Sequence, residues 1–254
     1  MPKFFIADLL ELGERLELQS DLDLNHLLRV RRVSVGENLR VVDGSGKNFL
    51  CQILTADPTA LKLGLEVIEE VPTEDLQKIE VSLFQAMPKG SKFDLCLQLA
   101  GSFGVDHVYP LETHRTIKKA KPERLDKQLG RWQKILEAQS KQSGKSRIAQ
   151  IHEPVEIKHA IDMTSWCKHR IVANFSNDSI SLKDYLTSLC LAAEAAAEII
   201  PLVFFIGPEG GFTEHEAKLF KANGIQAVDL GSRVLRSEYA ATQILAALTY
   251  EGLI

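Results

Sequence analysis

Hydrophobic and polar residues alternate in short runs over the first part of the chain. Apolar runs of this kind occupy residues 39–43, 48–54 and 60–68, which predicts three β-strands. The first two runs flank Gly44-Ser45-Gly46-Lys47, a sequence typical of a hairpin turn. We therefore expect a small β domain over residues 1–70.

From residue 76 onward, apolar runs alternate with longer segments of helical period. Strands are expected at 79–86, 107–111, 170–175, 202–206 and 227–230. Helices are expected at 92–100, 122–142, 182–199, 214–222 and 238–250. This alternation is typical of an α/β domain with a mostly parallel sheet, which we assign to 76–254. The charged stretch 69–75, which contains Pro72, is the expected linker.

The composition indicates the class of protein and its cellular compartment. Of the 254 residues, 45% are hydrophobic and 25% are charged, a balance typical of a globular protein. The four cysteines at 51, 96, 167 and 190 have no spacing suited to zinc, so we expect buried thiols in a reducing compartment and no metal. No run of eighteen apolar residues occurs, which predicts a cytoplasmic protein without a membrane segment.

Positive charge is concentrated in one stretch although the net charge is −4. Residues 112–147 hold eleven basic residues against four acidic ones, and Arg29, Arg31 and Arg32 form a second group. Such a stretch is either the solvated face of a helix or a surface that contacts the phosphates of a nucleic acid. The count alone leaves both interpretations open.

Two turns in the C-terminal half concentrate unusual residues where strands are expected to end. In an open α/β sheet, ligands bind beyond the carboxyl ends of the strands. The first turn follows the apolar strand that ends at Ile206, and it contains Gly207, Gly210 and Gly211. Thr213 and Glu216 then have the spacing of a capping box. An ordinary tight turn explains one glycine, whereas three indicate a close approach between the backbone and a ligand.

The second turn follows the strand expected at 227–230. It carries Arg233 and Arg236 directly before a predicted helix, and Glu238 in the first turn of that helix. Glu238 suits the helix dipole without any further role, whereas two cations before a helix N-terminus oppose the dipole. We therefore expect an anionic group, or a developing negative charge, near these arginines.

The segments Ile206–Phe212 and Leu230–Glu238, taken together, resemble the knotted methyltransferases of the SPOUT superfamily. The nearest resemblance is to the ribosomal RNA small subunit methyltransferase E family, which methylates N3 of a uridine in 16S ribosomal RNA. Further segments follow in the order of that family: His26–Val33 with Gly36-Glu37, Pro88-Lys89-Gly90, Phe103-Gly104-Val105, Pro110 with Thr113-His114-Arg115, Arg131–Ile135 and Gln142-Ser143-Gly144.

The chain also departs from the family pattern. Ser102 stands where the family has glutamate, Leu99 where it has lysine, and Tyr239 where it has threonine. Lys145 replaces an arginine. None of these changes removes a glycine of the two turns.

The resemblance implies a fold, a cofactor and partners. It implies a PUA-like β-barrel RNA-binding domain over 1–70 and a C-terminal trefoil-knot methyltransferase domain over 76–254. It also implies a homodimer that uses S-adenosyl-L-methionine on ribosomal RNA in the assembled small subunit. Because this cofactor has no phosphate, its site needs backbone groups that can reach the adenine, as glycine-rich loops provide.

The resemblance further implies roles for named residues. Glu238 is the expected proton acceptor, and Arg236 is expected to stabilise the charge that develops on the uracil oxygens. The expected cofactor-binding residues are Asn174, Phe175, Gly207, Pro208, Glu209, Gly210, Gly211, Leu230, Gly231, Val234, Leu235 and Arg236. The expected RNA-binding residues are His26, Arg29, Arg32, Lys89, Arg115, Arg131, Lys145 and Arg147.

Two other functions stay open on the sequence. In one alternative, the chain is an RNA-binding protein that holds the cofactor without this activity, or that acts on another RNA. In the other, it is a nucleotide-binding enzyme whose glycine turn holds a phosphate. Only the last of these would prefer a nucleoside triphosphate over S-adenosylmethionine.

Overall fold

The computed structural model describes residues 3–5, 10–19, 22–72, 77–88, 92–116, 124–174 and 178–254. The chain divides into two compact units. The first holds residues 1–75 together with 144–148, and the second holds 76–143 and 149–254. Among the described residues, no helix combines the length and apolar character needed to cross a membrane.

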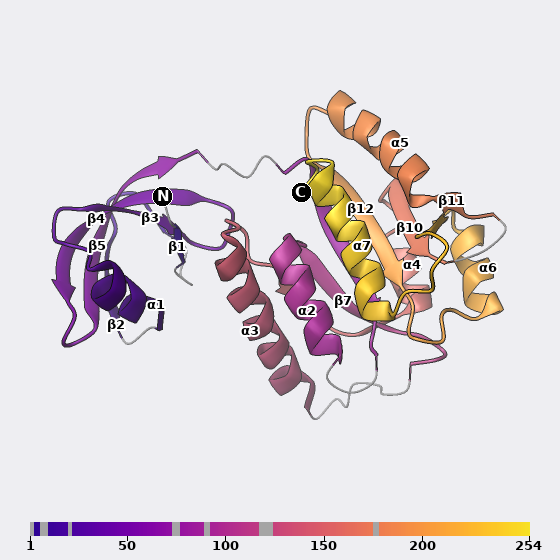
Figure 1. Ribbon diagram of the computed structural model, residues 1–254, viewed down its shortest axis with the longest axis horizontal. Coiled ribbons are helices and arrows are strands. Elements are labelled where there is room, and N and C mark those ends of the chain that lie inside the picture. Colours follow the sequence, from indigo (N-terminus) through magenta and orange to yellow (C-terminus); the bar gives the residue numbers. More distant parts are fainter. Residues whose placement is uncertain are drawn as a thin grey trace. The chain divides into compact units, whose positions relative to one another are not determined.

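The first unit is built on a five-stranded sheet with the order β1-β3-β4-β5-β2 (Figure 1). Its elements are β1 (Lys3–Phe5), β2 (Arg15–Gln19), α1 (Leu22–Asn25), the π-helix η1 (His26–Arg31), β3 (Asn38–Val42), β4 (Asn48–Asp57) and β5 (Lys62–Val71). Val42 pairs with Asn48 in an antiparallel ladder, which confirms the predicted hairpin. Because β5 continues to Val71, the expectation that the linker begins at residue 69 is wrong.

Five residues from later in the chain complete this first unit. After α3 (Leu125–Ser143), the segment 144–148 lies along the β3–β4 hairpin, where Ser45 forms a bridge with Arg147. The amide of Ile148 donates to the carbonyl of Gly44 at 3.0 Å. The Ser146 hydroxyl donates to the Asn48 side chain at 3.1 Å, and both residues are buried. The sequence division at 70–76 did not foresee this return, because it depends on contacts between distant residues.

The second unit contains a parallel sheet, as predicted, but its described residues form eight strands where the sequence indicated five. The order is β11-β13-β10-β12-β6-β7-β8, and β9 also pairs with β7. The strands are β6 (Ile79–Ala86), β7 (His107–Glu112), β8 (Gln150–Ile151), β9 (Val155–Glu156), β10 (His169–Ala173), β11 (Ile180–Ser181), β12 (Ile200–Ile206) and β13 (Gln226–Asp229). The helices are α2 (Lys92–Phe103), α3 (Leu125–Ser143), α4 (Ile157–Met163), α5 (Leu182–Ala195), α6 (Glu214–Ala222) and α7 (Ser237–Tyr250).

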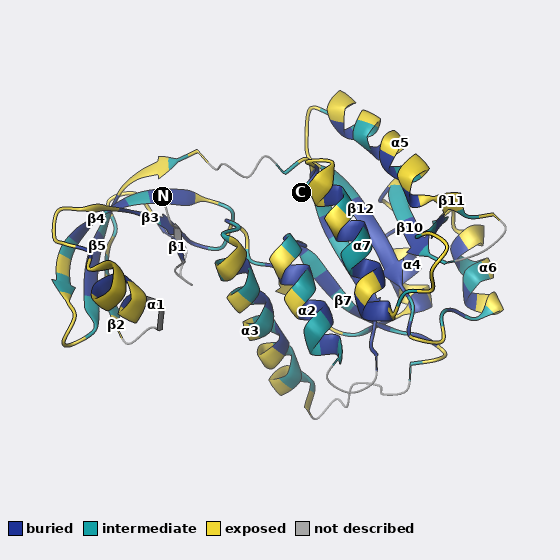
Figure 2. Ribbon diagram, in the orientation of Figure 1, coloured by how far each residue is buried: buried dark blue, intermediate teal, exposed yellow. Residues whose placement is uncertain are grey.

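Helices cover both faces of this sheet, because the buried strands are apolar on both sides (Figure 2). Along β12, Phe204 and Ile206 belong to the core under α2, α3, α5 and α7. Phe205 belongs to the opposite core, with α4 and α6. Figure 1 shows α2 between α3 and α7, which it contacts on either side. The period-two alternation of one strand therefore assigns helices to two layers.

Several element boundaries differ from the expected ones, and three of them bear on the loops described below. The helix expected over 182–199 ends at Ala195, and Ala196 is already extended. Pro201 in β12 disfavours helical backbone at the residue directly before it, Ile200, which is already in the strand. The strands expected to reach 175 and 230 end at Ala173 and Asp229, so Asn174 and Leu230 lie in loops.

Candidate cofactor pocket

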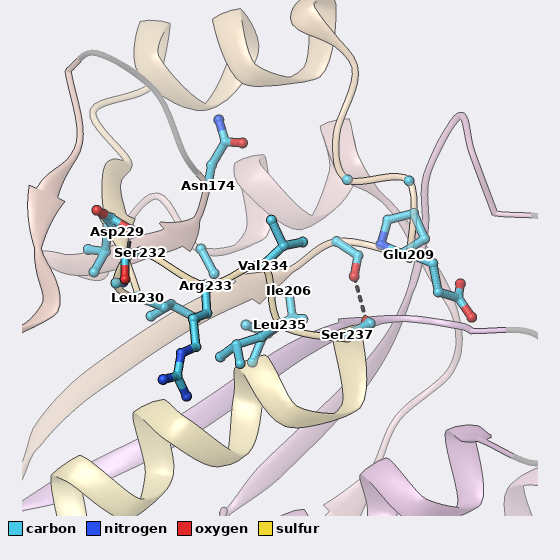
Figure 3. A pocket seen from close by; sticks show the side chains of 18 residues that line it. Asn174, Ile206, Glu209, Asp229, Leu230, Ser232, Arg233, Val234, Leu235 and Ser237 are labelled. Carbon is cyan, nitrogen blue, oxygen red and sulfur yellow. Dashed lines mark hydrogen bonds between the residues drawn. The ribbon is translucent and has the colours of Figure 1, made fainter.

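A cavity of about 530 Å³ lies at the carboxyl ends of β10, β12 and β13 (Figure 3). Its wall combines three segments that are far apart in the sequence and one helix start. The lining residues are Ala173, Asn174, Ile206, Gly207, Pro208, Glu209, Gly210, Gly211, Val228, Asp229, Leu230, Gly231, Ser232, Arg233, Val234, Leu235, Ser237 and Ala240. The two turns singled out in the sequence therefore converge on one cavity.

The first turn, residues 207–213, needs glycine for close packing. A Cβ on Gly207 would lie 3.2 Å from the ring of Phe212, tighter than ordinary van der Waals contact. Gly211 has φ +66°, a left-handed conformation that favours glycine. The amide of Gly211 donates to the carbonyl of Pro208 at 2.8 Å, which closes the turn.

The predicted capping box fastens this turn to α6. The amide of Glu216 donates to the Thr213 hydroxyl at 3.2 Å, and the amide of Thr213 donates to Glu216 Oε2 at 2.7 Å. Glu216 is buried, and its Oε1 also accepts from the amide of His114 at 2.8 Å. One carboxylate therefore holds both the end of the turn and a second loop, 113–116.

The second turn, residues 229–236, is held by fewer groups. Asp229 Oδ1 accepts from the amide of Gly231 at 2.9 Å, and Gln243 of α7 donates to the carbonyl of Leu230 at 2.7 Å. Gly231 has φ +112°. The side chain of Val234 lines the cavity and is fully exposed.

Two buried polar residues that were not predicted support the wall. Ser237, the first residue of α7, donates from its hydroxyl to the carbonyl of Gly207 at 2.5 Å, the dashed contact in Figure 3. Gln85, near the end of β6, donates to the same hydroxyl at 2.8 Å. The one sequence signal for Gln85 is an amide within an otherwise apolar segment, Leu83–Met87.

Most of the expected cofactor residues lie on the wall. Phe175 is outside the described residues, and Arg236 is exposed and does not line the cavity. The expected residues on the wall are Asn174, Gly207, Pro208, Glu209, Gly210, Gly211, Leu230, Gly231, Val234 and Leu235. Glu209 is held by Lys92 of α2, with 3.0 Å between Nζ and Oε1.

Glu238 lies behind the wall rather than on it. It is 3% exposed, and its Oε2 has no hydrogen-bond partner among the described residues. Burial raises the pKa of the Cys96 thiol to about 12, and the charge of Glu238 adds to this shift. The carboxylate therefore lies near Cys96 of α2.

The expected RNA-binding residues fall in both units. His26, Arg29, Arg32, Lys145 and Arg147 belong to the first unit, Arg115 and Arg131 belong to the second, and Lys89 lies outside the described residues. Arg29 donates to the carbonyl of Pro58 at 3.2 Å. Arg32 ends the π-helix in a left-handed conformation, φ 54°.

The two arginines of the second unit have partners within it. Arg131 makes a two-pronged ion pair with Asp94, at 2.6 and 2.9 Å, and the hydrogen bond raises the pKa of the guanidinium. Arg115 donates to the carbonyl of Gly210, so its side chain supports the first turn. Among the described residues, no cluster of three or more His, Cys, Asp or Glu could hold a metal ion.

Comparison with known proteins gives the family. The family described as RNA methyltransferase domain matches residues 75–249, and the RNA methyltransferase PUA domain matches residues 21–66. Ribosomal RNA small subunit methyltransferase E of Synechocystis sp. is 30% identical over 88% of this chain and 69% of that protein. The Mesomycoplasma hyopneumoniae protein of the same name is 28% identical over 96% of this chain and 97% of its own length.

A solved structure carries the same fold. It is the ribosomal RNA small subunit methyltransferase E of Neisseria gonorrhoeae bound to S-adenosyl methionine. That protein is 27% identical, with a TM-score of 0.76 over 98% of this chain and 97% of its own. By its matched domains and by these relatives, the chain belongs to the ribosomal RNA small subunit methyltransferase E family of RNA methyltransferases.

Proposed function

We propose that this chain transfers the methyl group of S-adenosylmethionine to N3 of a uridine in 16S ribosomal RNA. The observation that carries the proposal is the convergence of two glycine-rich loops on one cavity at the carboxyl ends of β10, β12 and β13. The homologue from Neisseria gonorrhoeae, which has the same fold, is bound to this methyl donor.

The residues of the wall fit this donor. The cavity volume of about 530 Å³ lies within the range of about 300 to 1,000 Å³ that small-molecule sites occupy. Much of the wall is backbone and aliphatic side chain, including Ile206, Val228 and Leu235, which suits an uncharged adenine. Asn174 and Asp229 are polar side chains on the same wall, and we assign them to the ribose hydroxyls.

The bound donor supplies a methyl group on a sulfonium, and the chain's residues place the acceptor. Holding the two reactants within attack distance supplies much of the acceleration in a displacement of this kind. We assign to Arg236 the stabilisation of negative charge on the uracil oxygens, since it is exposed at the rim, directly before Ser237 of the wall.

The proton on N3 of the uridine must also leave, and we assign the role of proton acceptor to Glu238. Its Oε2 has no hydrogen-bond partner among the described residues, and Glu238 lies behind the wall, directly after the lining residue Ser237. Glu209 is the competing carboxylate, since it lines the cavity itself. Separate Glu238→Gln and Glu209→Gln variants distinguish the two, because only loss of the true acceptor moves the pH profile of the methyl transfer.

We further propose that the predicted basic residues of both units contact ribosomal RNA in the assembled small subunit. Arg32 and Arg147 of the first unit, with Arg115 of the second, would contact phosphates or bases. The C-terminal segments are proposed to form a trefoil knot, and the chain a homodimer. The exposed apolar side chains Leu191 and Tyr239 support an interface. A monomeric mass by light scattering at micromolar concentration would contradict the dimer.

The decisive experiment is methylation of small-subunit particles and of naked 16S RNA with labelled donor, followed by mapping of the modified base. We expect a methyl group on N3 of one uridine, in the particles. Modification of another base would overturn the assigned position. Calorimetric binding of the donor without turnover would favour an RNA-binding protein, and preference for a nucleoside triphosphate would favour a phosphate site.

A further inference from the structure

Two buried polar residues, Ser237 on the wall of the cavity and Gln85 behind it, lie where the surrounding core is apolar. Gln85 is fully buried in β6, and Ser237 is 4% exposed at the start of α7. Polar side chains in such places lower stability unless their hydrogen-bonding groups are paired. The hydrogen-bond partners of Gln85 and Ser237 therefore indicate the role of these two side chains.

The hydrogen bonds of the pair have one direction. A carbonyl only accepts, so the single proton of the Ser237 hydroxyl goes to Gly207. The lone pair of that hydroxyl then accepts from Gln85 Nε2, whose other hydrogen goes to the carbonyl of Ala86 at 3.0 Å. Both hydrogens of the amide are in use, which fixes its orientation. The order of donors is Gln85, Ser237, Gly207.

This chain of bonds joins three segments that are far apart in the sequence. Gly207 is the first residue after β12, where the backbone enters the glycine-rich turn. An aliphatic contact fills space but does not fix the direction of a carbonyl, whereas a hydrogen bond does. The Ser237 hydroxyl therefore sets where the turn begins, and Gln85 sets the direction of that hydroxyl.

The arrangement also leaves one buried acceptor of Gln85 unpaired, which lowers the stability of the fold. The Oε1 atom of Gln85 is buried and has no hydrogen-bond partner among the described residues. An unpaired buried acceptor lowers stability, and a methionine of similar size would avoid it. A polar residue kept under that cost at the edge of a ligand cavity indicates a role in function rather than in folding.

We propose that Gln85 and Ser237 are positioning residues for the methyl donor, which hold the carbonyl of Gly207 and with it the first turn of the cavity. This inference rests on the proposed function, since it takes the donor as the ligand of this cavity. Neither residue touches the reacting atoms in this proposal; both act through Gly207.

The test uses the full chain with Ser237→Ala, Ser237→Thr and Gln85→Met. Ser140→Ala is the matched control, because Ser140 is also buried and its hydroxyl accepts from the amide of Ala149 at 3.4 Å. Ser140 belongs to α3, which contributes no residue to the wall of the cavity. The dissociation constant of S-adenosylhomocysteine is measured by calorimetry, the KM values for donor and RNA by turnover, and stability by thermal unfolding.

We expect Ser237→Ala to weaken binding by about three- to tenfold, the usual effect of one lost hydrogen bond. Gln85→Met is expected to weaken it by about threefold without a loss of Tm. Ser237→Thr should restore binding to within about twofold, and Ser140→Ala should leave it unchanged. The KM for the donor should rise while the KM for RNA stays constant, a split that a purely structural role would not produce.

Equal affinity of wild type, Ser237→Ala and Gln85→Met would overturn the inference and leave the proposed function in place. Absence of binding to the wild type would instead overturn the proposed function. Hydrogen exchange of the free chain then decides the inference alone. We expect the amides of Gly207 and of 209–211 to exchange faster in Ser237→Ala but not in Ser140→Ala, and unchanged exchange in both would overturn the proposed positioning. Gln85→Met supplies the same comparison if Ser237→Ala fails to fold.

Discussion

The two loops that wall the cavity differ in how they are fastened. In the loop 207–213, Ser237 holds the carbonyl of Gly207, Arg115 holds that of Gly210, and Glu216 holds the amide of Thr213. In the loop 229–236, residues 231–234 are exposed, and the fastening contacts lie near its start, at Leu230 and Gly231.

This difference in fastening decides how each loop contributes to the free energy of ligand binding. A loop fastened along its whole length presents the same backbone before and after a ligand binds, so the ligand meets no ordering cost there. A loop fastened only near its start loses freedom when a ligand covers it, and part of the binding energy is spent on that ordering. We therefore expect changes in the first loop to alter stability and affinity together, and changes in the second to alter affinity alone.

The largest effect is expected for Gly207→Val. Its Cβ would lie 3.2 Å from the ring of Phe212, so the first loop must shift. Overpacking of this kind costs about 1–3 kcal/mol, which corresponds to about fivefold to 150-fold in affinity for S-adenosylhomocysteine if the strain falls on the cavity. Calorimetry measures the affinity and thermal unfolding measures the stability, and both should fall.

Gly130→Ala is the control for this substitution. Gly130 is exposed within α3, and a Cβ there meets nothing within 4 Å. It should raise stability by up to about 1 kcal/mol and leave affinity unchanged. Normal binding by Gly207→Val would show that the first loop is as adaptable as the second.

Glu216→Ala is expected to have the next largest effect, mainly on stability. It removes the acceptor for the amides of Thr213 and His114 at a buried position. The combined loss is about 2–3 kcal/mol, or roughly 5–10 °C in Tm, with weaker donor binding. Glu214→Ala, an exposed change in the same first turn of α6, should lower Tm by at most about 1–2 °C.

Val234→Ala probes the second loop. The Val234 side chain is fully exposed in the free chain, so its truncation should leave Tm unchanged. It lines the cavity, and a bound donor would cover it, so affinity should fall by up to about tenfold for the methyl groups lost. A drop in Tm equal to that of Glu216→Ala would show that the second loop is also fastened, which would end the distinction.

The smallest effect is expected from pH, away from both loops. At the amino end of β7, His107 Nδ1 lies 3.1 Å from His152 Nε2, and Glu80 lies 3.4 Å from the other nitrogen of His107. Burial, and then His107, lowers the pKa of His152. His152 therefore binds a proton more readily in the unfolded chain than in the folded one. Its contribution to the free energy of unfolding is fully present above a pH of about 6.5, and the free energy of unfolding falls as the pH drops below that value.

His152→Phe tests this expectation, because it keeps an aromatic ring on Tyr109, whose ring centroid lies 4.1 Å from that of His152. The Tm of the variant should fall less than that of the wild type between pH 7 and pH 5. Donor affinity should change equally in both proteins. A steeper fall in the variant would contradict the assigned proton.

The sequence predicted the elements whose patterns are local. The strand 79–86 and the helix 214–222 have the predicted bounds, since an apolar run and a capping box are visible in the residues themselves. Helix α4 was missed, because seven residues are too few to show a helical period. The π-helix η1 was missed because it lies in a stretch without a clear strand or helix pattern.

The same rule applies to the cavity. Gly207 and Gly231 were predicted because glycine has few other reasons to cluster after strands. Gln85 was not, because its partner Ser237 lies 152 residues away. Glu238 was predicted from its position at a helix start, but a sequence position does not show that its carboxylate lies behind the wall, near Cys96.

The return of residues 144–148 to the first unit has a consequence for dissection of the protein. The backbone passes between the units at 72–77 and again on both sides of 144–148. A protease that cuts only between Pro72 and Gln77 would nick the chain, yet the amino-terminal fragment would stay attached through Ser45, Arg147 and the buried Asn48–Ser146 pair. A fragment that starts at residue 76 would in turn carry five residues whose partners are missing, so the two halves are better studied as one molecule.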